Sequence, residues 1–446
     1  MSFSAAALRA VLDAHTPAGA TGLAVALSGG ADSASLLAAA SALNADSRGL
    51  PLRAVHIDHG LQPAAGAFRR ACAALCADLN VPLTVISVDV RAPAGASLEA
   101  AARDARYAAF EAELRLRECL LTAHHREDQA ETLLLQALRG AGLKGMSAMP
   151  VCRPLGQGWH LRPVLDIPQR DLLDFGARAG GGAVHDPMNE DMRFDRGYLR
   201  RQVWPLIQRR WPGAGTALSR TARHVAEAQD LLERAAAADV GRLRDGDALS
   251  VPGLRALNSQ ERIHALRLWL REAGVEPPPE ARLIEALRQI LEAEADHLPA
   301  VKWGGHALRR YRHRVFLTET RAPRLEAVLR WSAAPGSALD LGSNLGVLRW
   351  TSQSGGIDAR RLPETLTVRR RSGGETLKPG SLAKTHSVQH LCQSQGVLPW
   401  LRDALPLVFA GDSLIAVADL WLDARWCVAL GDPGLGLAWE RGPIIV

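Results

Sequence analysis

The sequence predicts an α/β protein: an N-terminal domain built on a parallel β-sheet, then a helical domain and a small α+β domain at the C-terminus. Three observations support this prediction. Apolar runs of strand length alternate with helix-forming stretches through residues 1–150, the runs are aliphatic enough for strands buried on both faces, and polar residues follow several of them. Ligands of such sheets bind at the carboxyl ends of the strands, so the polar residues predict a site there.

Four apolar runs qualify as strands, namely Leu23–Leu27, Leu52–Ile57, Leu83–Val88 and Cys119–Ala123. Chemically active residues lie at or just after the ends of three of them: Ser28 to Gly30, His56 to Gly60, and His124 with His125. Parallel strands end at one edge of their sheet. We therefore expect these three groups to lie on one rim.

The first group opens the stretch Ser28-Gly29-Gly30-Ala31-Asp32-Ser33, at a turn from strand to helix. A helix N-terminus offers unpaired N–H groups, and glycines let a bulky anion approach the backbone, so the turn suits a phosphate. No Lys-Ser/Thr pair follows, which excludes the Walker A loop. Asp32 would repel phosphate unless a divalent cation lay between them, so it implies Mg²⁺. The alternative is a structural turn capped by Ser28 or Asp32.

The third group leads into a predicted helix in which Asp128 and Glu131 are neighbours on one face. Glu131 also falls in the apolar stripe of Leu134, Leu135 and Leu138. A carboxylate in such a stripe needs a partner, because leaving it unpaired costs several kcal/mol. The partner is either a ligand amine or an arginine in a structural salt bridge, and Arg103 and Arg106 are available.

The chain has 446 residues, of which 47% are hydrophobic and 22% charged, with a net charge of +6. This length allows two or three domains, and we expect them at residues 1–213, 217–320 and 362–446. The N-terminus lacks a long apolar segment, so we expect a cytoplasmic protein without a membrane anchor. The six cysteines form no CxxC pair, and Cys72 and Cys76 are interpreted as buried thiols of one helix.

Residues 186–212 form a basic segment in which arginines alternate with aromatic residues, a composition suited to stacking on bases and pairing with phosphates. The alternative is a solvated basic helix, with Trp204 and Trp211 in the core. Further on, residues 301–319 predict a strand, a Gly-Gly turn and a second strand, while residues 333–357 are expected to be loose.

Five motifs taken in order identify a family. They are SGGADS, VHIDHGLQ, RDARY, HHREDQAET with RGAGLKGMSAMP, and DPMNEDMRFDRGYLR. Together they resemble the motif set of the tRNA(Ile)-lysidine synthetase family, within the N-type ATP pyrophosphatase (PP-loop) superfamily. The resemblance is strong over residues 1–210 and implies that the first domain is a PP-loop ATPase domain and that the two later domains bind tRNA.

The resemblance implies a two-step ligation on a tRNA(Ile) with a CAU anticodon. ATP adenylates C2 of the wobble cytidine and releases pyrophosphate, and the ε-amine of L-lysine then displaces AMP. Ser28 to Ser33 would hold the pyrophosphate, Asp32 would bind Mg²⁺, and Val55 to Asp58, including His56, would flank the adenosine.

The remaining roles that the resemblance implies concern lysine and RNA. Asp128 and Glu131 would bind the lysine cation, Arg103 or Arg106 its carboxylate, and His124 or His125 the base or the transferring phosphate. The residues expected to contact RNA are Asn189, Arg196, Arg200 and Arg201.

Two other functions stay open at this point. A tRNA thiolase of the same superfamily would need reactive cysteines. A non-catalytic tRNA-binding protein is suggested by Glu127, Met188 and Gly197, which depart from the family pattern. The sequence leaves the oligomeric state undetermined, with a homodimer among the alternatives.

Overall fold

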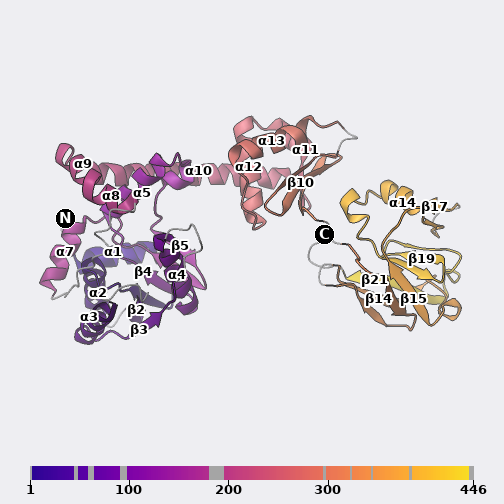
Figure 1. Cartoon of the computed structure of the whole chain (residues 1–446), viewed down its shortest axis with the longest axis horizontal. Coiled ribbons are helices and arrows are strands. Elements are labelled where there is room, and N and C mark those ends of the chain that lie inside the picture. The colour runs from indigo at the N-terminus through magenta and orange to yellow at the C-terminus, as the bar shows by residue number, and fades with distance from the viewer. Residues whose placement is uncertain are drawn as a thin grey trace. The chain divides into compact units, whose positions relative to one another are not determined.

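The computed structural model of the chain describes residues 3–44, 49–58, 65–90, 98–179, 195–294, 298–321, 324–342, 345–380 and 384–440. Contacts divide the chain into two compact units, Met1–Leu232 and Glu233–Val446. Both are drawn in Figure 1. The three domain ranges expected from the sequence stay a prediction.

The first unit is built on a six-stranded sheet with the order β3-β2-β1-β4-β6-β5. Its strands are β1 (Gly22–Ala26), β2 (Leu52–Asp58), β3 (Leu83–Ser87), β4 (Glu118–Leu121), β5 (Cys152–Leu155) and β6 (Gly158–Leu161). All neighbouring pairs are parallel except β5 with β6. This confirms the predicted α/β class and the four predicted strands. Strands β5 and β6, which have only four residues each, were not predicted.

Helices cover both faces of this sheet, as the aliphatic strands predict. The helices of the unit are α1 (Ala5–His15), α2 (Ala31–Asn44), α3 (Ala65–Asp78), α4 (Leu98–Glu113), α5 (Arg126–Leu138), α6 (Leu143–Met146), α7 (Gln169–Arg178), α8 (Asp195–Tyr198), the π-helical turn η2 (Leu199–Val203), α9 (Trp204–Arg210) and the start of α10 (Ala214–Leu243). One core joins one face of the strands to α1, α2, α3 and α7, and a second core joins the other face to α4. In Figure 1, α2 and α3 lie on one side of the strands and α4 on the other. Ala54 and Val55, adjacent on β2, belong to the two different cores.

The order of the strands places a switch point at β1. From β1 the chain moves to β2 and β3 on one side, and it then crosses to β4 on the other side. Ligands of open α/β sheets bind in the crevice at such a point, outside the carboxyl ends of the strands. The segments after β1 and β4 therefore flank the expected crevice.

The second unit begins with helices packed on a small sheet. The helices are α11 (Val251–Ala256), α12 (Ser259–Glu272) and α13 (Glu280–Glu292), and the strands are β7 (Arg244–Asp245), β8 (Ala248–Ser250), β9 (Ala300–Trp303), β10 (His306–Tyr311) and β11 (Arg314–Glu319). The predicted strand, Gly-Gly turn and strand are present as β9 and β10. The second predicted strand is broken, however, by a turn in which Arg312 has a φ of +55°, and the chain returns as β11.

The remainder of this unit is mostly β-structure. Its strands are β12 (Leu329–Ser332), β13 (Ala338–Asp340), β14 (Val347–Ser354), β15 (Thr365–Arg369), β16 (Thr376–Leu377), β17 (His386–Ser387), β18 (Leu407–Ala410), β19 (Ser413–Val417), β20 (Trp421–Leu422) and β21 (Pro433–Glu440). The helices are η3 (Ala359–Arg361), α14 (Val388–Ser394) and η4 (Pro399–Leu401).

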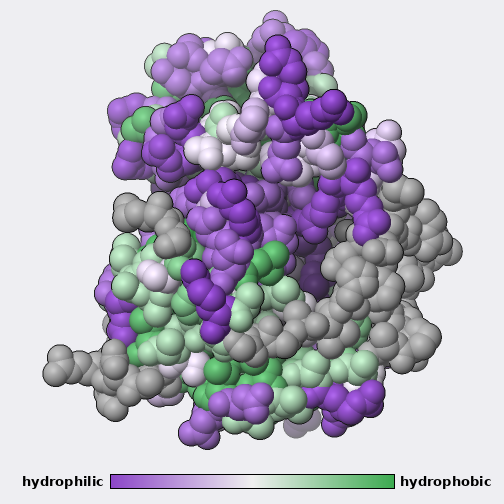
Figure 2. All heavy atoms as spheres, turned by 90° about the vertical axis from the view of Figure 1, so that its left-hand side faces the viewer, coloured by the Kyte–Doolittle hydropathy of each residue, from purple (hydrophilic) through white to green (hydrophobic). Residues whose placement is uncertain are grey.

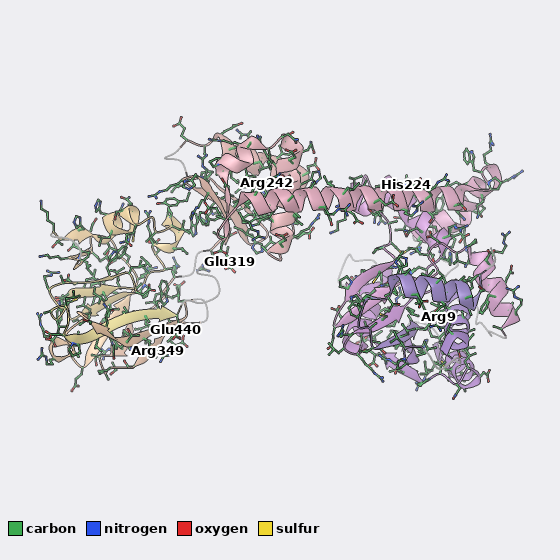
Figure 3. The ribbon with its side chains drawn as sticks, turned by 180° about the vertical axis from the view of Figure 1, so that it is seen from behind. Arg9, His224, Arg242, Glu319, Arg349 and Glu440 are labelled. Atoms are coloured by element: carbon green, nitrogen blue, oxygen red, sulfur yellow. The ribbon has the colours of Figure 1, made fainter. Side chains whose placement is uncertain are left out.

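The stretch 333–357, expected to be loose, contains β13 and β14. All of β14 pairs with β21, and Trp350 of β14 stacks on Trp331 with ring centres 4.7 Å apart. Figure 3 shows Arg349 and Glu440 on these two strands, where Nε of Arg349 lies 3.3 Å from Oε1 of Glu440. Long-range pairing and tryptophan burial order a segment whose serine and glycine content suggested a loop.

A buried ion pair joins β2 to β4 across β1. Arg53 donates from Nε and Nη2 to the two carboxylate oxygens of Glu118, each at 2.7 Å, and from Nη1 to Glu113 at 2.6 Å. Arg53 and Glu118 are both buried. Removing one member of such a pair leaves an uncompensated charge in the interior, which is far more costly than losing a surface pair.

We predict that Glu118→Ala lowers the free energy of opening of β1, β2 and β4 by about 3–5 kcal/mol, because the Arg53 guanidinium stays buried. Hydrogen exchange read by mass spectrometry on peptides from these strands measures the change. The double variant Arg53→Met/Glu118→Leu, which buries no charge, should recover most of the loss. Equal exchange in Glu118→Ala and the wild type would contradict the prediction.

Candidate active site at the carboxyl edge of the sheet

The turn after β1 is narrow and tied to itself. The amide of Ser28 donates to Oγ of Ser33 at 3.2 Å, and the Ser33 hydroxyl lies 3.0 Å from the carbonyl of Gly30, to which it donates. Gly29 has a φ of +90°, and a Cβ there would lie 2.8 Å from Cδ1 of Phe68. Only glycine fits this position without strain. The helix that follows begins at Ala31, so Asp32 and Ser33 belong to its first turn.

His56 supports this turn through a hydrogen bond to the residue that precedes it. Its Nδ1 lies 2.8 Å from the carbonyl oxygen of Leu27, and its ring is buried. Because a carbonyl only accepts, Nδ1 carries the proton. Asp58, the last residue of β2, is only partly buried at the same edge. Since β1, β2 and β4 are parallel, the three predicted groups share one rim, as far as their residues are described.

Asp32 faces groups from two other elements. Nε2 of Gln169, on α7, lies 3.2 Å from each Asp32 oxygen, and Nε2 of His125 lies 4.0 Å from Oδ2. Burial raises the pKa of Asp32, with His125 and Gln169 acting in the opposite direction. A carboxylate in this condition gains from a cation placed beside it. Gln169 carried no motif and was missed in the sequence.

His125 lies between three carboxylates. Its Nδ1 is 3.1 Å from Oε2 of Glu127, and its Nε2 is 3.4 Å from Oδ2 of Asp128. Burial by itself would lower the pKa of His125, but Glu127, Asp128 and Asp32 together raise it. Glu127 also accepts the backbone N–H of Gln169 at 2.9 Å, so it anchors α7 beside α5. His125 thus connects the Asp32 turn to the acidic pair of α5.

That acidic pair is engaged by two arginines of the basic segment. Nη2 of Arg200 lies 2.6 Å from Oδ1 of Asp128, and its Nε lies 2.6 Å from Oε1 of Glu131. Arg196 reaches the same two carboxylates, at 3.0 Å and 3.1 Å. Glu131 is 1% exposed, while the arginine side chains keep 28% and 37% of their surface. We name these four residues the acidic–arginine cluster.

The neighbouring charges stabilise the ionised forms of Asp128 and Arg200. Burial opposes ionisation of Asp128, but the charges of His125 and Arg196 outweigh it and bring the pKa of Asp128 to about 2. Burial would likewise lower the pKa of Arg200, but its bonds to Glu131 raise it overall. Two carboxylates and two guanidinium groups therefore balance their charges in a partly enclosed site.

Arg103 and Arg106, considered as partners of the acidic pair, are found elsewhere. Both lie on α4 beside the ring of Tyr107, with Cζ 5.2 Å and 6.0 Å from its centre. The structure assigns the salt-bridge role to Arg196 and Arg200 instead, among the residues it describes. The apolar stripe is also shorter than expected, because Leu138 is 80% exposed.

The remaining predicted RNA contacts lie on or before η2 and α9. Arg201 is an exposed residue of η2, and Asn189 lies outside the described residues. The alternative that both tryptophans lie in the core is correct for Trp204, which packs against Ala130 of α5. It is wrong for Trp211, which is exposed. The upper part of the face in Figure 2, at the height of α9 and α10 in Figure 1, is mainly hydrophilic.

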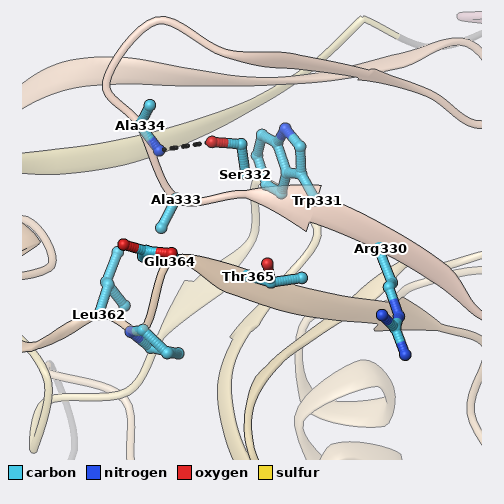
Figure 4. Close-up of a pocket in the computed structure, with 9 residues that line it drawn as sticks. Arg330, Trp331, Ser332, Ala333, Ala334, Leu362, Glu364 and Thr365 are labelled. Carbon is cyan, nitrogen blue, oxygen red and sulfur yellow. Dashed lines mark hydrogen bonds between the residues drawn. The ribbon is translucent and has the colours of Figure 1, made fainter.

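Other parts of the chain offer weaker candidates. An open hollow between β12 and β15 is lined by residues 330–334 and 362–365 and contains none of the predicted site residues (Figure 4). The described ranges contain no cluster of three or more His, Cys, Asp or Glu side chains arranged for a metal ion. Within the same ranges, no helix has the length and apolar character needed to cross a membrane.

Comparisons with known proteins agree with the order of these parts. Three family models match: a PP-loop domain at residues 4–207, a TilS substrate binding domain at 249–316 and a TilS substrate C-terminal domain at 366–439. The tRNA(Ile)-lysidine synthase of Alkalilimnicola ehrlichii is 40% identical over 431 residues, which cover 95% of this chain and 95% of that relative. The chain belongs to the tRNA(Ile)-lysidine synthase family.

Two further matches differ in how closely they resemble this chain. The tRNA(Ile)-lysidine synthase of Methylococcus capsulatus is 38% identical over 91% of this chain and 93% of that relative. A solved structure of the U34-tRNA thiolase NcsA from Methanococcus maripaludis is 16% identical, covers 50% of this chain and 78% of its own, and has a TM-score of 0.39. So distant a likeness carries no argument about the reaction.

The cysteines of this family member are poor nucleophiles. Burial raises the pKa of Cys72 to about 12 and that of Cys76 to about 11. The thiolate is the reactive form of cysteine, and an apolar surrounding suppresses it. The structure therefore does not favour the thiolase alternative.

We predict that Cys72 and Cys76 resist alkylation by iodoacetamide at pH 8 in the folded protein, since their thiols stay protonated and enclosed. Peptide mass spectrometry of the labelled protein measures this. The same protein in concentrated urea is the reference, in which all six cysteines should react. Fast labelling of either residue in the folded state would contradict the interpretation.

Proposed function

We propose that this chain ligates L-lysine to C2 of the wobble cytidine in the CAU anticodon of tRNA(Ile), consuming ATP and releasing AMP and pyrophosphate. One observation carries the proposal: an anion-binding turn and a buried acidic pair lie at the same edge of the sheet. His125 links them, with its Nε2 4.0 Å from Asp32 and 3.4 Å from Asp128. Such a site brings a triphosphate next to an amine.

The turn Ser28 to Ser33 would hold the phosphates of ATP. Backbone N–H groups at the start of α2 and the dipole of this 14-residue helix stabilise the negative charge that develops as pyrophosphate leaves. Asp58, at the end of β2, would contact the ribose, and His56 shapes the turn through its hydrogen bond to the carbonyl of Leu27.

Mg²⁺ fits the residues around this turn. It is commonly held by one or two carboxylates together with substrate phosphates and water. Asp32 supplies one carboxylate in the first turn of α2, and its burial-raised pKa means that a neighbouring cation would stabilise the ionised form. When bound, the metal would neutralise the charge between Asp32 and the phosphates.

The acidic–arginine cluster would recognise lysine. Asp128 and Glu131 attract the cationic side chain, while an arginine suits the α-carboxylate because its guanidinium can bind both carboxylate oxygens. Arg196 and Arg200 already bond the acidic pair and keep part of their surface free. Arg103 and Arg106, which the sequence suggested for this carboxylate, lie on α4 beside Tyr107. His124, which follows β4, would contact the adenylated base or its phosphate.

The tRNA would meet the same region from the basic segment. Arg201, Arg209 and Arg210 are exposed on η2 and α9, and Cζ of Arg210 lies 5.5 Å from the ring centre of Trp211. Arginine and an exposed aromatic ring can bind phosphates and stack on an unpaired base. Asn189, Arg196, Arg200 and Arg201 remain the proposed RNA contacts, with Asn189 proposed from the sequence alone.

The decisive experiment is transfer of labelled lysine. With ATP, Mg²⁺ and a CAU-anticodon transcript of tRNA(Ile), we expect radioactive lysine to enter the RNA in proportion to the pyrophosphate released. A transcript that differs only at the wobble base is the control and should accept none. Pyrophosphate release without lysine transfer, or neither, would favour a different reaction or a non-catalytic tRNA-binding protein.

We predict that Asp32→Ala reduces pyrophosphate release by at least about 100-fold, because the negative charge of the phosphates loses its metal-bound stabilisation. Affinity for the tRNA transcript, measured by filter binding, should change little. Asp13→Ala, at an exposed aspartate of α1, is the matched control. If Asp32→Ala lost pyrophosphate release and tRNA affinity to the same extent, Asp32 would support the fold rather than the reaction.

A further inference from the structure

A continuous chain of hydrogen bonds runs through the interior to His124. It begins at Arg162, just after β6, whose Nη2 lies 3.2 Å from Nδ1 of His160. Nε2 of His160 is 2.8 Å from the hydroxyl of Thr122, and that hydroxyl is 2.7 Å from Nδ1 of His124. Arg162, His160 and Thr122 are all buried. None of these three was selected from the sequence.

The backbone holds the members of this chain in line. His160 pairs with Leu120 of β4 in the parallel register, and the amide of Thr122 donates to the carbonyl of Leu161 at 3.1 Å. The guanidinium of Arg162 is also fixed at its other end, because Nη1 donates to the carbonyl of Pro150 at 2.7 Å. Tyr107 packs on His160 with ring centres 5.6 Å apart. The groups therefore have little freedom to rearrange.

The guanidinium of Arg162 determines which atom donates in each hydrogen bond of this chain. It has only N–H donors, so Nδ1 of His160 must accept, and a neutral His160 then carries its proton on Nε2. That proton goes to the oxygen of Thr122, and the single hydroxyl proton of Thr122 goes to Nδ1 of His124. Nδ1 of His124 accepts, so its proton is on Nε2. In the reverse direction a protonated Nδ1 of His160 would point at Nη2 of Arg162, which can only donate.

Both histidines are neutral, as this direction requires. Burial lowers the pKa of His160 to about 2 and that of His124 to about 3. Burial also lowers the pKa of Arg162, to about 10, which still leaves it charged at neutral pH.

We propose that Arg162, His160 and Thr122 are positioning residues that lock His124 as a neutral imidazole with its proton on Nε2. His124 then offers one fixed hydrogen-bond donor. Nε2 of His124 makes no hydrogen bond to the residues that the structure describes, and the charges acting on the ring include Asp128, Arg196 and Arg103. The ring therefore lies within the electrostatic reach of the acidic–arginine cluster, the region assigned above to lysine.

The role of His124 follows from this tautomer. It donates to an oxygen that gains negative charge, such as an adenylate phosphate oxygen or the C2 oxygen of the base. It does not remove the proton from the lysine amine, because its only lone pair is engaged with Thr122. This assignment of a substrate rests on the proposed function, whereas the tautomer itself does not.

Nuclear magnetic resonance tests the tautomer without any substrate. In protein labelled with ¹⁵N on the histidine rings, long-range ¹H–¹⁵N correlations distinguish a protonated from an unprotonated ring nitrogen. The variant His124→Gln identifies which signals belong to His124. We expect His124 and His160 with bare Nδ1 and protonated Nε2 at pH 7.5. A proton on Nδ1 of either ring, or a charged imidazole, would overturn the proposal.

Kinetics test the hydroxyl of Thr122. Thr122→Val keeps the shape but loses the bond to His124, and should lower kcat for pyrophosphate release about 10- to 100-fold with the KM values for ATP and tRNA unchanged. Thr122→Ser keeps the hydroxyl and should restore most of the rate. Thr221→Val, at an exposed threonine of α10, is the control for a threonine-to-valine substitution and should leave kcat unchanged.

Each result has a distinct meaning. If Thr122→Ser is as slow as Thr122→Val, packing rather than the hydroxyl matters, and the proposal is wrong. If the wild-type protein transfers no lysine at all, the proposed function fails, and the tautomer measurement alone then decides the hydrogen-bond chain.

Discussion

The buried ion pairs between α5 and the basic segment are the contact on which the rest of the site depends. Glu131 is almost fully enclosed, and a lone carboxylate there would cost several kcal/mol. Arg196 and Arg200 remove that cost, and Trp204 packs on Ala130 one turn further along the segment. Pro205 donates no backbone hydrogen bond, and the turn before it, η2, is π-helical. Polar and apolar contacts thus fix the segment to the edge of the sheet at adjacent places.

This arrangement ties two roles to one set of side chains. The arginines that the sequence suggested for RNA also balance the acidic pair suggested for lysine. An anion that draws Arg200 away would leave Asp128 and Glu131 with less positive charge nearby, and a cation that binds the acidic pair would release the arginines for phosphate. Electrostatics alone would couple the two proposed ligands, since the four charged groups are in direct contact with one another.

The rim itself was predictable, because parallel aliphatic strands force the residues after them to one edge, and the polar residues after β1, β2 and β4 are visible in the sequence. The partners of those residues were not. Arg196 and Arg200 are 65 to 72 residues from the carboxylates they bind, and helical spacing reveals only that Glu131 needs some cation. His160 lies in a four-residue strand too short for a periodic pattern, and Gln169 carries no motif. Pairing of β14 with β21 and burial of Trp350 similarly ordered a stretch whose composition suggested a loop.

The adjacent histidines His124 and His125 show why such partners decide chemistry. Identical side chains one residue apart have pKa values shifted in opposite directions, lowered in His124 and raised in His125. His125 is buried and His124 is partly buried, and burial by itself would lower the pKa of both rings, so burial cannot separate them. His125 has three carboxylates around it, whereas His124 has a threonine hydroxyl on Nδ1 and Arg162 among its nearby charges. One ring therefore favours the charged form beside Asp32, and the other stays a neutral donor. Divergent environments of this kind let two copies of one residue perform different tasks in a single site.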